Sequence, residues 1–462
     1  MHERHSGAAS SRLASIDILR GVAIVWVVLF HVWGDLEFFP GVPRVYYEQF
    51  TWQIKDGRGP LAIFTSFTDL LFRDGFQGVP LFMMISGISL TIAAYRAGGA
   101  VSWPRFFVAR FKKLMLPYWT GVAITYAVIA AIAWRQASLG SGAFGSQVGD
   151  GVTISLHSVV NVDWGIALAS IALVPRLLSA DKFFAPQLAL WFVGLLAQYY
   201  LLFPLLFAAM RRIGVLPFLL LTFATTVGAN AWIVHEYGAI ELKFWLVTGW
   251  APFRLFEFTA GMAIGWLLVA PEARHALAFA RHPAALGTLL ALGLAAHTGG
   301  DLLIGRWSAD QLIHSESMLY WQALALPLTT LGLALLALPL LVRRPSRIDF
   351  ALPVRALATV GVMSYALLIV NDPMRLVASQ LRLEEVSPAV WWTFLIAIYV
   401  PVSVIIAWPL AHLLGLMPKR SAPRVTTAWE RGGRGDSPAT ARPGYAPELA
   451  IEAPRAVPAV AE

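Results

Sequence analysis

The sequence predicts an all-α polytopic membrane protein, a helix bundle with roughly ten transmembrane helices. Of its 462 residues, 58% are hydrophobic and 13% are charged, a composition more apolar than that of ordinary soluble domains. Apolar runs long enough to cross about 30 Å of hydrocarbon recur along the chain to about residue 415. Since short segments between these runs hold most of the charge, we expect one membrane domain over residues 16–415.

Hydropathy places the expected helices in order along the chain. They cover residues 16–36, 76–95, 114–134, 187–210, 215–234, 252–270, 284–299, 318–342, 356–377 and 388–415. Residues 164–179 are apolar but short. Counting them as a span would invert the topology of everything that follows, so we interpret this segment as re-entrant or interfacial.

Basic residues set the expected orientation. With a cytoplasmic N-terminus, every basic cluster falls inside, namely Arg96 to Lys113, Arg211 and Arg212, Arg274 to Arg281, Arg343 to Arg355, and Lys419 to Arg424. Both termini are therefore expected in the cytoplasm, and the protein in a bacterial inner membrane in contact with its lipids. The positive-inside pattern also explains the net charge of +8, so nucleic acid is not an expected partner.

The two ends of the chain are expected to lie outside the membrane domain. Residues 1–15 form a cytoplasmic segment and not a signal peptide, because Asp17 and Arg20 interrupt the apolar run and no cleavage pattern follows. Residues 416–462 have few large apolar side chains and are expected to be a disordered cytoplasmic tail, either solvated or touching anionic lipid. The absence of cysteine excludes disulfides, thiolate metal sites and a catalytic thiol.

The first expected helix carries ionisable side chains, which cost at least about 2.5–3.5 kcal/mol each inside a span. Asp17 and Arg20 are three residues apart and can pair near the inner surface. His31 follows Arg20 by eleven residues, which returns it to within roughly 20° of the same helix face, about 16 Å along the axis. A lone membrane histidine often only makes an interhelical hydrogen bond, so this geometry leaves its role open.

Six segments in sequence order carry a resemblance to a known family. They are Arg12 to Ala23 with Phe30 and His31, Gly75 to Phe82 with Ser86 and Gly87, Arg110 to Trp119, Trp191 and Phe192 with Gln198 to Pro204, Phe253 to Phe258 with Gly261 and Met262, and Gly361 to Tyr365 with Pro373. Together they resemble the acyltransferase family 3 membrane proteins over residues 12 to about 415. The opening and residues 85–90 also resemble the heparan-glucosaminide acetyltransferase-like membrane proteins.

The resemblance implies transfer of an acyl group, often acetyl from acetyl-CoA, to a hydroxyl of an envelope glycan or another acceptor. His31 is the expected general base, since a neutral imidazole can take the proton of the attacking hydroxyl. Glu257 is expected at a similar depth, where it would orient the imidazole. Arg254, one turn away, is counted with the catalytic residues, although a plain ion pair with Glu257 would equally explain it.

The donor is expected on the cytoplasmic side. Arg20, Arg110 and Lys113 are the candidate acyl-CoA-binding residues, though the positive-inside rule alone also explains such charges. The candidate substrate-binding residues are Asp35, Trp191 and Asn371, and Asp35 also lies where it would cap or solvate the helix end.

The chain departs from the family's usual pattern at four positions. Leu196 and Ala197 stand where many members carry acidic residues, Pro80 where Asp is usual, and Asn371 where His is common. These departures leave the acceptor unspecified.

Several other sites are not expected. The chain has no Walker loop, no Gly-x-Ser-x-Gly elbow and no His/Asp cluster at metal-ligand spacing, so no metal is predicted. Four further histidines lie in expected loops or at span edges and are predicted to be solvated: His157, His235, His297 and His314. The main alternative function is a glycan or lipid transporter or flippase using Arg20, His31 and Glu257 as a relay, against which stands the absence of evident inverted repeats. A membrane scaffold is a third interpretation.

Overall fold

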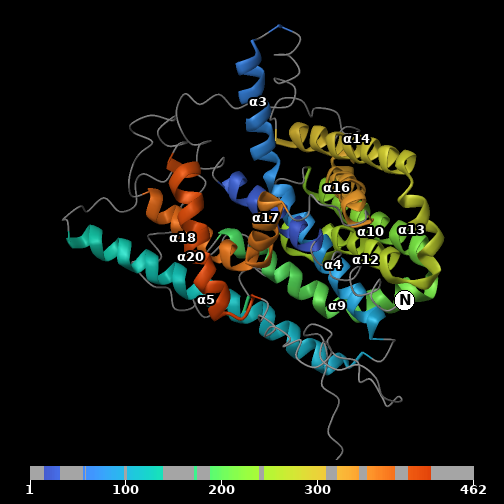
Figure 1. Cartoon of the computed structure of the whole chain (residues 1–462), viewed down its shortest axis with the longest axis horizontal. Coiled ribbons are helices and arrows are strands. Elements are labelled where there is room, and N and C mark those ends of the chain that lie inside the picture. The colour runs from blue at the N-terminus through green and yellow to red at the C-terminus, as the bar shows by residue number, and fades with distance from the viewer. Residues whose placement is uncertain are drawn as a thin grey trace, which may run out of the picture.

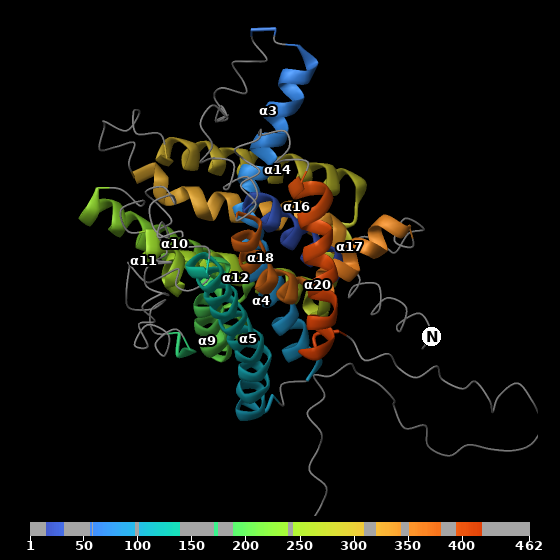
Figure 2. The same cartoon turned by 90° about the vertical axis from the view of Figure 1, so that its left-hand side faces the viewer.

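The computed structural model is an all-α bundle (Figures 1 and 2). It describes residues 15–31, 56–57, 59–97, 101–138, 171–173, 188–238, 244–308, 320–342, 351–379 and 394–417. No strand occurs within these ranges. The expected all-α fold class is confirmed.

A helix over residues 15–31 passes through the middle of the bundle, as the dark blue ribbon in both views shows. Small residues let two neighbours approach its backbone closely. A Cβ on Gly361 would overlap the main-chain oxygen of Asp17, and one on Gly75 would overlap that of Trp26. This first helix is therefore held between the segment that contains Gly75 and α17 (Leu352–Val362), to which Gly361 belongs.

The segment after this helix is longer than expected. α3 (Pro60–Arg73) projects at the top of both views and continues through the short η1 (Asp74–Gln77) into α4 (Gly78–Arg96). The hydropathy pattern predicted no helix between residues 36 and 76. α4 then packs along α12 (Ala251–Val269), where a Cβ on Gly87 would overlap the main-chain oxygen of Phe258.

The basic segment that precedes the third expected span is helical. α5 (Trp103–Ser138) is one helix of 36 residues that includes Arg105, Arg110 and Lys113, so it begins well before the helix expected over residues 114–134. At 1.5 Å per residue this helix is about 54 Å long, well beyond the roughly 30 Å of hydrocarbon in a bilayer. Its first turns can therefore extend past the membrane with their cations in water.

The central helices follow without long connections. α9 (Trp191–Ile213), α10 (Val215–Tyr237), the short α11 (Phe244–Gly249) and α12 succeed one another, and α9 lies beside α5. A short 3-10 turn, η2 (Leu188–Leu190), leads into α9. Between α11 and α12 the helix is interrupted at Trp250, whose backbone is extended.

Two long helices cover the side of the bundle that carries α10 and α12. After η4 (Pro271–Ala273) and α13 (Arg274–Ala280), α14 (Pro283–Ser308) runs beside α16 (Ala325–Val342), which follows η5 (Gln322–Leu324). Gly332 of α16 permits this approach, because a Cβ there would lie 2.5 Å from the main-chain nitrogen of His297 on α14.

The last described part of the chain is bent. α17 and α18 (Ser364–Ser379) meet at 77°, and α18 packs against both α5 and α20 (Val400–Leu413). A π-helical turn, η8 (Leu395–Tyr399), leads into α20. Such turns are rare in proteins, and those that occur are often found at functional sites.

The number of full-length spans is lower than predicted. Among the described residues, seven helices are long and apolar enough to cross a membrane, or eight if the bent α17–α18 pair counts as one span. The other two expected spans correspond to shorter described helices, residues 15–31 and Ala397–Leu413. The sequence pattern located the apolar segments, whereas hydropathy does not show where a helix bends or where it ends.

Several predictions fall outside the described residues. They concern the segment 1–14, Asp35, His157, His314, most of 164–179 and the tail beyond 417. The division into an N-terminal segment, a membrane domain and a tail thus stays a prediction.

Candidate active site

His31 lies against α18 at the end of the described part of the first helix. Its side chain is buried, with 8% of its surface exposed, and its Nδ1 lies within hydrogen-bond distance of the side-chain amide of Asn371. Asn371 itself has no exposed surface. Two residues predicted from separate parts of the sequence, one as the base and one as a substrate contact, therefore touch.

Tyr399 holds Asn371 from the other side. Its hydroxyl lies 2.6 Å from Oδ1 of Asn371 and 2.9 Å from the main-chain oxygen of the same residue. Tyr399 ends the π-helical turn η8 and is 1% exposed. These contacts fix the amide that faces His31, because both oxygen atoms of Asn371 are tied to one hydroxyl.

The bend between α17 and α18 makes the contact with His31 possible. Gly361 of α17 packs on the main chain at Asp17, and Asn371 of α18 reaches His31 on the same helix. The 77° bend lies between these two points of contact. The chain segment 352–379 therefore meets the first helix twice, once at each end of its described length.

Asp372 links this group to the start of α9. One of its carboxylate oxygens accepts a hydrogen bond of 2.6 Å from the main-chain nitrogen of Ala189, and the other accepts one of 3.2 Å from Arg375. Ala189 precedes Trp191, the first residue of α9, by two positions. The position of Trp191 is thus tied to the residue next to Asn371.

A buried ion pair lies over Trp191. Nε of Arg254 donates to Oε1 of Glu257 at 2.7 Å, and the Arg254 guanidinium carbon lies 5.2 Å from the centre of the Trp191 ring. Both charged side chains are almost fully buried. Nη2 of Arg254 and Oε2 of Glu257 have no hydrogen-bond partner within the described structure, so each group keeps polar capacity for another molecule.

Gln198 of α9 hydrogen-bonds to the main chain just before the helix that carries this ion pair. Its amide nitrogen donates to the main-chain oxygen of Gly249 at 2.7 Å, and its amide oxygen accepts from the main-chain nitrogen of Ala251 at 3.1 Å. These two bonds satisfy the groups exposed by the break between α11 and α12. The φ and ψ angles of Arg254, −131° and 17°, mark a second departure from helical geometry one turn later.

Comparison with known protein families decides the assignment. A family model described as an acyltransferase domain matches residues 13–408. The chain belongs to acyltransferase family 3. Searches of curated proteins and of solved structures found no match. Family membership and the apolar helices together establish an integral membrane acyltransferase.

In this acyltransferase the predicted catalytic residues form two groups. His31 contacts Asn371, whereas Glu257 pairs with Arg254 beside Trp191. The carboxylate of Glu257 makes no hydrogen bond to the imidazole in the structure. Asn371 contacts the imidazole instead, and the hydrogen bond from Ala189 to Asp372 connects the residue next to Asn371 to the turn that precedes Trp191.

The candidate donor-binding residues lie apart from these groups. Arg20 donates to Asp17 at 3.1 Å and contacts the Ser89 hydroxyl at 3.4 Å. The Arg110 guanidinium lies over the rings of Phe106 and Tyr200, and its Nε is buried with no hydrogen-bond partner among the described residues. Lys113 is exposed on α5, one helical turn after Arg110.

Sequence reasoning missed two residues of the site. Asp372 carried a usable signal, because an ionisable residue inside the apolar stretch 356–377 needs a partner or a purpose. Tyr399 carried none, since nothing distinguishes it from other aromatic residues of its span. Its importance comes only from the π-helical turn and the contacts with Asn371.

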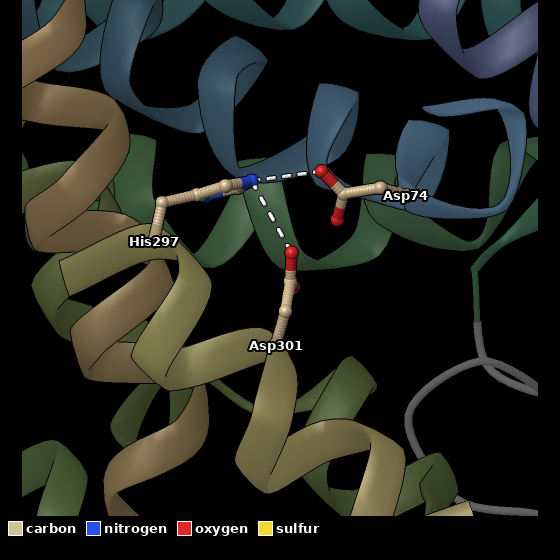
Figure 3. A group of neighbouring side chains, drawn as sticks. All are labelled: Asp74, His297 and Asp301. Carbon is tan, nitrogen blue, oxygen red and sulfur yellow. Dashed lines mark hydrogen bonds and ion pairs between the residues drawn. The ribbon is translucent and has the colours of Figure 1, made fainter. Parts of the chain in front are cut away.

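Asp74, His297 and Asp301 form a third polar group, which was not expected from the sequence. His297 is 9% exposed and its Nε2 lies 2.7 Å from Oδ2 of Asp74 and 3.4 Å from Oδ2 of Asp301 (Figure 3). The prediction that His297 is solvated is wrong, and so is the statement that the chain has no His/Asp cluster of metal-ligand type. His297 lies well inside α14, which continues past residue 299, and Asp74 is 223 residues away in sequence. His235, by contrast, is exposed as expected and lies 3.1 Å from the Tyr320 hydroxyl.

Proposed function

We propose that this protein transfers an acyl group, most simply acetyl, from cytoplasmic acyl-CoA to a hydroxyl of an envelope glycan, with His31 as the general base. The observation that carries the proposal is the buried contact between His31 Nδ1 and the amide of Asn371. A held imidazole in a water-poor site is suited to accept a proton. Family membership supplies the reaction class.

The hydrogen-bond network permits the tautomer that a base requires. An amide can present either its oxygen or its NH₂ group to a neighbour. In the structure the amide nitrogen of Asn371 faces His31 Nδ1 and Oδ1 accepts from Tyr399. Turning the amide by about 180° exchanges these two atoms, so that Nδ1–H donates to Oδ1 and Nε2 keeps the lone pair that takes a proton. Tyr399 then donates to the main-chain oxygen of Asn371, 2.9 Å away, and accepts from the amide NH₂.

The reaction follows from that tautomer. The acceptor oxygen bonds to the thioester carbonyl carbon while His31 Nε2 takes the hydroxyl proton. The C–S bond then breaks, and the departing sulfur receives a proton from the imidazolium, which restores the base. The products are the acyl ester and CoA thiol, so no redox partner is needed.

The Arg254–Glu257 pair lies over Trp191, whose position is tied to Asp372 through Ala189. Its unsatisfied Nη2 is a buried donor of the kind that stabilises negative charge as it develops on a carbonyl oxygen. Glu257 keeps that guanidinium in place through Nε, and Trp191 stacks below it. This arrangement supports a role for Arg254 on the acyl oxygen, for Glu257 as its positioning partner and for Trp191 as a substrate contact.

The cationic first turns of α5 support a cytoplasmic donor site. Arg110 rests on two aromatic rings with a buried, unsatisfied Nε, and Lys113 is exposed one turn further on. Phosphates of a CoA carrier are matched by such guanidinium and ammonium donors. Arg20, which is paired with Asp17 on the first helix, is the third cation proposed to bind the donor.

A transfer assay separates this function from transport. Inverted membrane vesicles that contain the protein receive acetyl-CoA labelled in the acetyl group, and the envelope glycan fraction is then examined for ester-linked label by mass analysis. We expect labelled ester to form in these vesicles and to be absent from vesicles of a deletion strain. Glycans from the deletion strain should lack the same ester in intact cells. Equal labelling in both vesicle preparations would contradict the proposal.

A further inference from the structure

The group formed by Asp74, His297 and Asp301 is separate from the candidate active site described above. Asp74 comes from η1 and the other two residues from α14, where they are four positions apart and so share a helix face. One ligand atom of each residue can be chosen such that all three lie within 4.8 Å of one another. Figure 3 shows both carboxylates directed at the same nitrogen of His297.

A fourth polar side chain lies against this group. Gln77 has no exposed surface, and its amide nitrogen lies 3.4 Å from Oδ1 of Asp301. The amide oxygen of Gln77 and Oδ1 of Asp74 are both buried without a hydrogen-bond partner. Buried oxygen atoms of this kind are costly unless something satisfies them. They mark a site with acceptors in excess of the donors that the described structure supplies.

The charges of the group are also unbalanced. Two carboxylates face one imidazole, so when both carboxylates are ionised even a protonated His297 leaves a net charge of −1. No Lys or Arg makes an ion pair with either carboxylate within the described parts of the chain. A bound cation would remove the imbalance, and Asp301, with 26% of its side chain exposed, gives an ion a way in.

We propose that Asp74, His297 and Asp301 bind a divalent metal ion of the zinc class, with Gln77 hydrogen-bonded to Asp301. One imidazole nitrogen with carboxylate oxygens is a donor set that suits Zn²⁺. Ligand bonds of about 2.0–2.1 Å in a tetrahedron separate the ligand atoms by roughly 3.3 Å. The distances from Nε2 to the two carboxylate oxygens, 2.7 and 3.4 Å, lie on either side of that value. In the bound state Nε2 is deprotonated and binds the metal directly.

The position of the site gives the ion a structural consequence. The His297 ring lies 6.3 Å from the ring of Trp26 on the first helix, and the Trp26 indole donates to the main-chain oxygen of Leu71 at 2.6 Å. Gly75, next to Asp74, packs on the main chain of Trp26. An ion at this site would therefore clamp α14 to the segment that supports the helix carrying His31.

Metal content tests the proposal without reference to activity. The full-length protein is purified in detergent without a polyhistidine tag, stripped with a chelator, dialysed against Zn²⁺ and then against metal-free buffer. Bound zinc is measured by elemental mass spectrometry and the thermal unfolding midpoint by intrinsic fluorescence. We expect about one zinc per chain and a midpoint that rises when zinc is restored.

Variants locate the ion. Asp301→Asn and His297→Gln should hold no zinc above background, and their midpoints should not respond to it. His235→Gln removes an exposed histidine and should behave like the wild type. The proposal is overturned if the wild type retains no stoichiometric zinc, a result that needs no variant to fold, or if the Asp301 and His297 variants retain as much as the wild type.

Discussion

His31 and Asn371 are 340 residues apart in sequence and lie within hydrogen-bond distance in the folded protein. The contact joins the first helix to α18, and it forms where α18 turns back after the bend that follows α17. Asn371 stands where histidine is common in the family's pattern, so in this chain a neutral amide contacts His31. The amide is fixed in turn by the Tyr399 hydroxyl.

Replacement of Asn371 separates a positioning role from packing. Asn371→Leu keeps the volume but removes the group that faces Nδ1, and kcat should fall roughly 10- to 100-fold while the KM for acyl-CoA stays unchanged. Asn371→Asp restores an acceptor for Nδ1–H and should recover most of the rate. Both variants are compared by steady-state kinetics. Equal rates in Asn371→Leu and the wild type would show that the contact has no part in the reaction.

Variants of the Arg254–Glu257 pair should separate its effect on stability from its effect on activity. Glu257→Leu leaves a buried, uncompensated guanidinium, which costs about 3–5 kcal/mol and should lower the unfolding midpoint clearly. The double change Arg254→Met with Glu257→Leu removes both charges and should restore the midpoint. If the pair serves the reaction as proposed, the restored protein is inactive in the transfer assay. Full activity in the double variant would reduce the pair to a structural one.

Close packing at Gly361 should be intolerant of a single methyl group. Gly361→Ala places a Cβ against the main-chain oxygen of Asp17, which no side-chain movement can relieve. Overpacking of this kind costs typically about 1–3 kcal/mol, so the unfolding midpoint should fall and the His31–Asn371 contact should weaken with it. Gly287→Ala is the matched control, since nothing lies within 4 Å of its added Cβ. A control that loses as much stability as Gly361→Ala would refute the packing argument.

The proposed donor site on α5 can be tested through the thermal stability of the protein. Acyl-CoA should protect the wild type against heat, by about 2.7 kcal/mol when the ligand is at 100 times its Kd. The double change Arg110→Ala with Lys113→Ala should weaken that protection, because both cations on α5 are lost. Arg211→Ala removes an exposed basic residue at the end of α9 and should leave it unchanged. An equal midpoint shift in the double variant and the wild type would assign Arg110 and Lys113 to membrane topology alone.

The sequence was most informative where one physical rule dominates. Transfer of apolar residues into lipid sets the position of the expected spans, and each coincides with a described helix. The helix α3 and the first turns of α5 were not foreseen, because hydropathy marks long apolar runs and not helical structure as such. Hydropathy also gives no direct sign of the bend between α17 and α18.

For the candidate site, the sequence showed local pairs within a helix but not contacts between distant segments. Helix geometry placed Arg20 and His31 on one helix, and the i, i+3 spacing of Arg254 and Glu257 allowed the pairing that the structure shows. The contacts His31–Asn371 and Asp74–His297 join residues more than 200 positions apart, and no local pattern reports such proximity. His297 and Asp301, four residues apart within an apolar helix, were the one local sign of the proposed metal site.

The rate of acyl transfer by His31→Gln tests the central claim most directly. The variant and the wild type are purified in the same detergent, and ester formation on the glycan fraction of the deletion strain is followed together with release of CoA thiol. Glutamine can keep a hydrogen bond to Asn371 but cannot accept a proton at neutral pH. We therefore predict an unchanged unfolding midpoint and a transfer rate at least about 100-fold lower. A His31→Gln protein that transfers the acyl group at the wild-type rate would contradict the account.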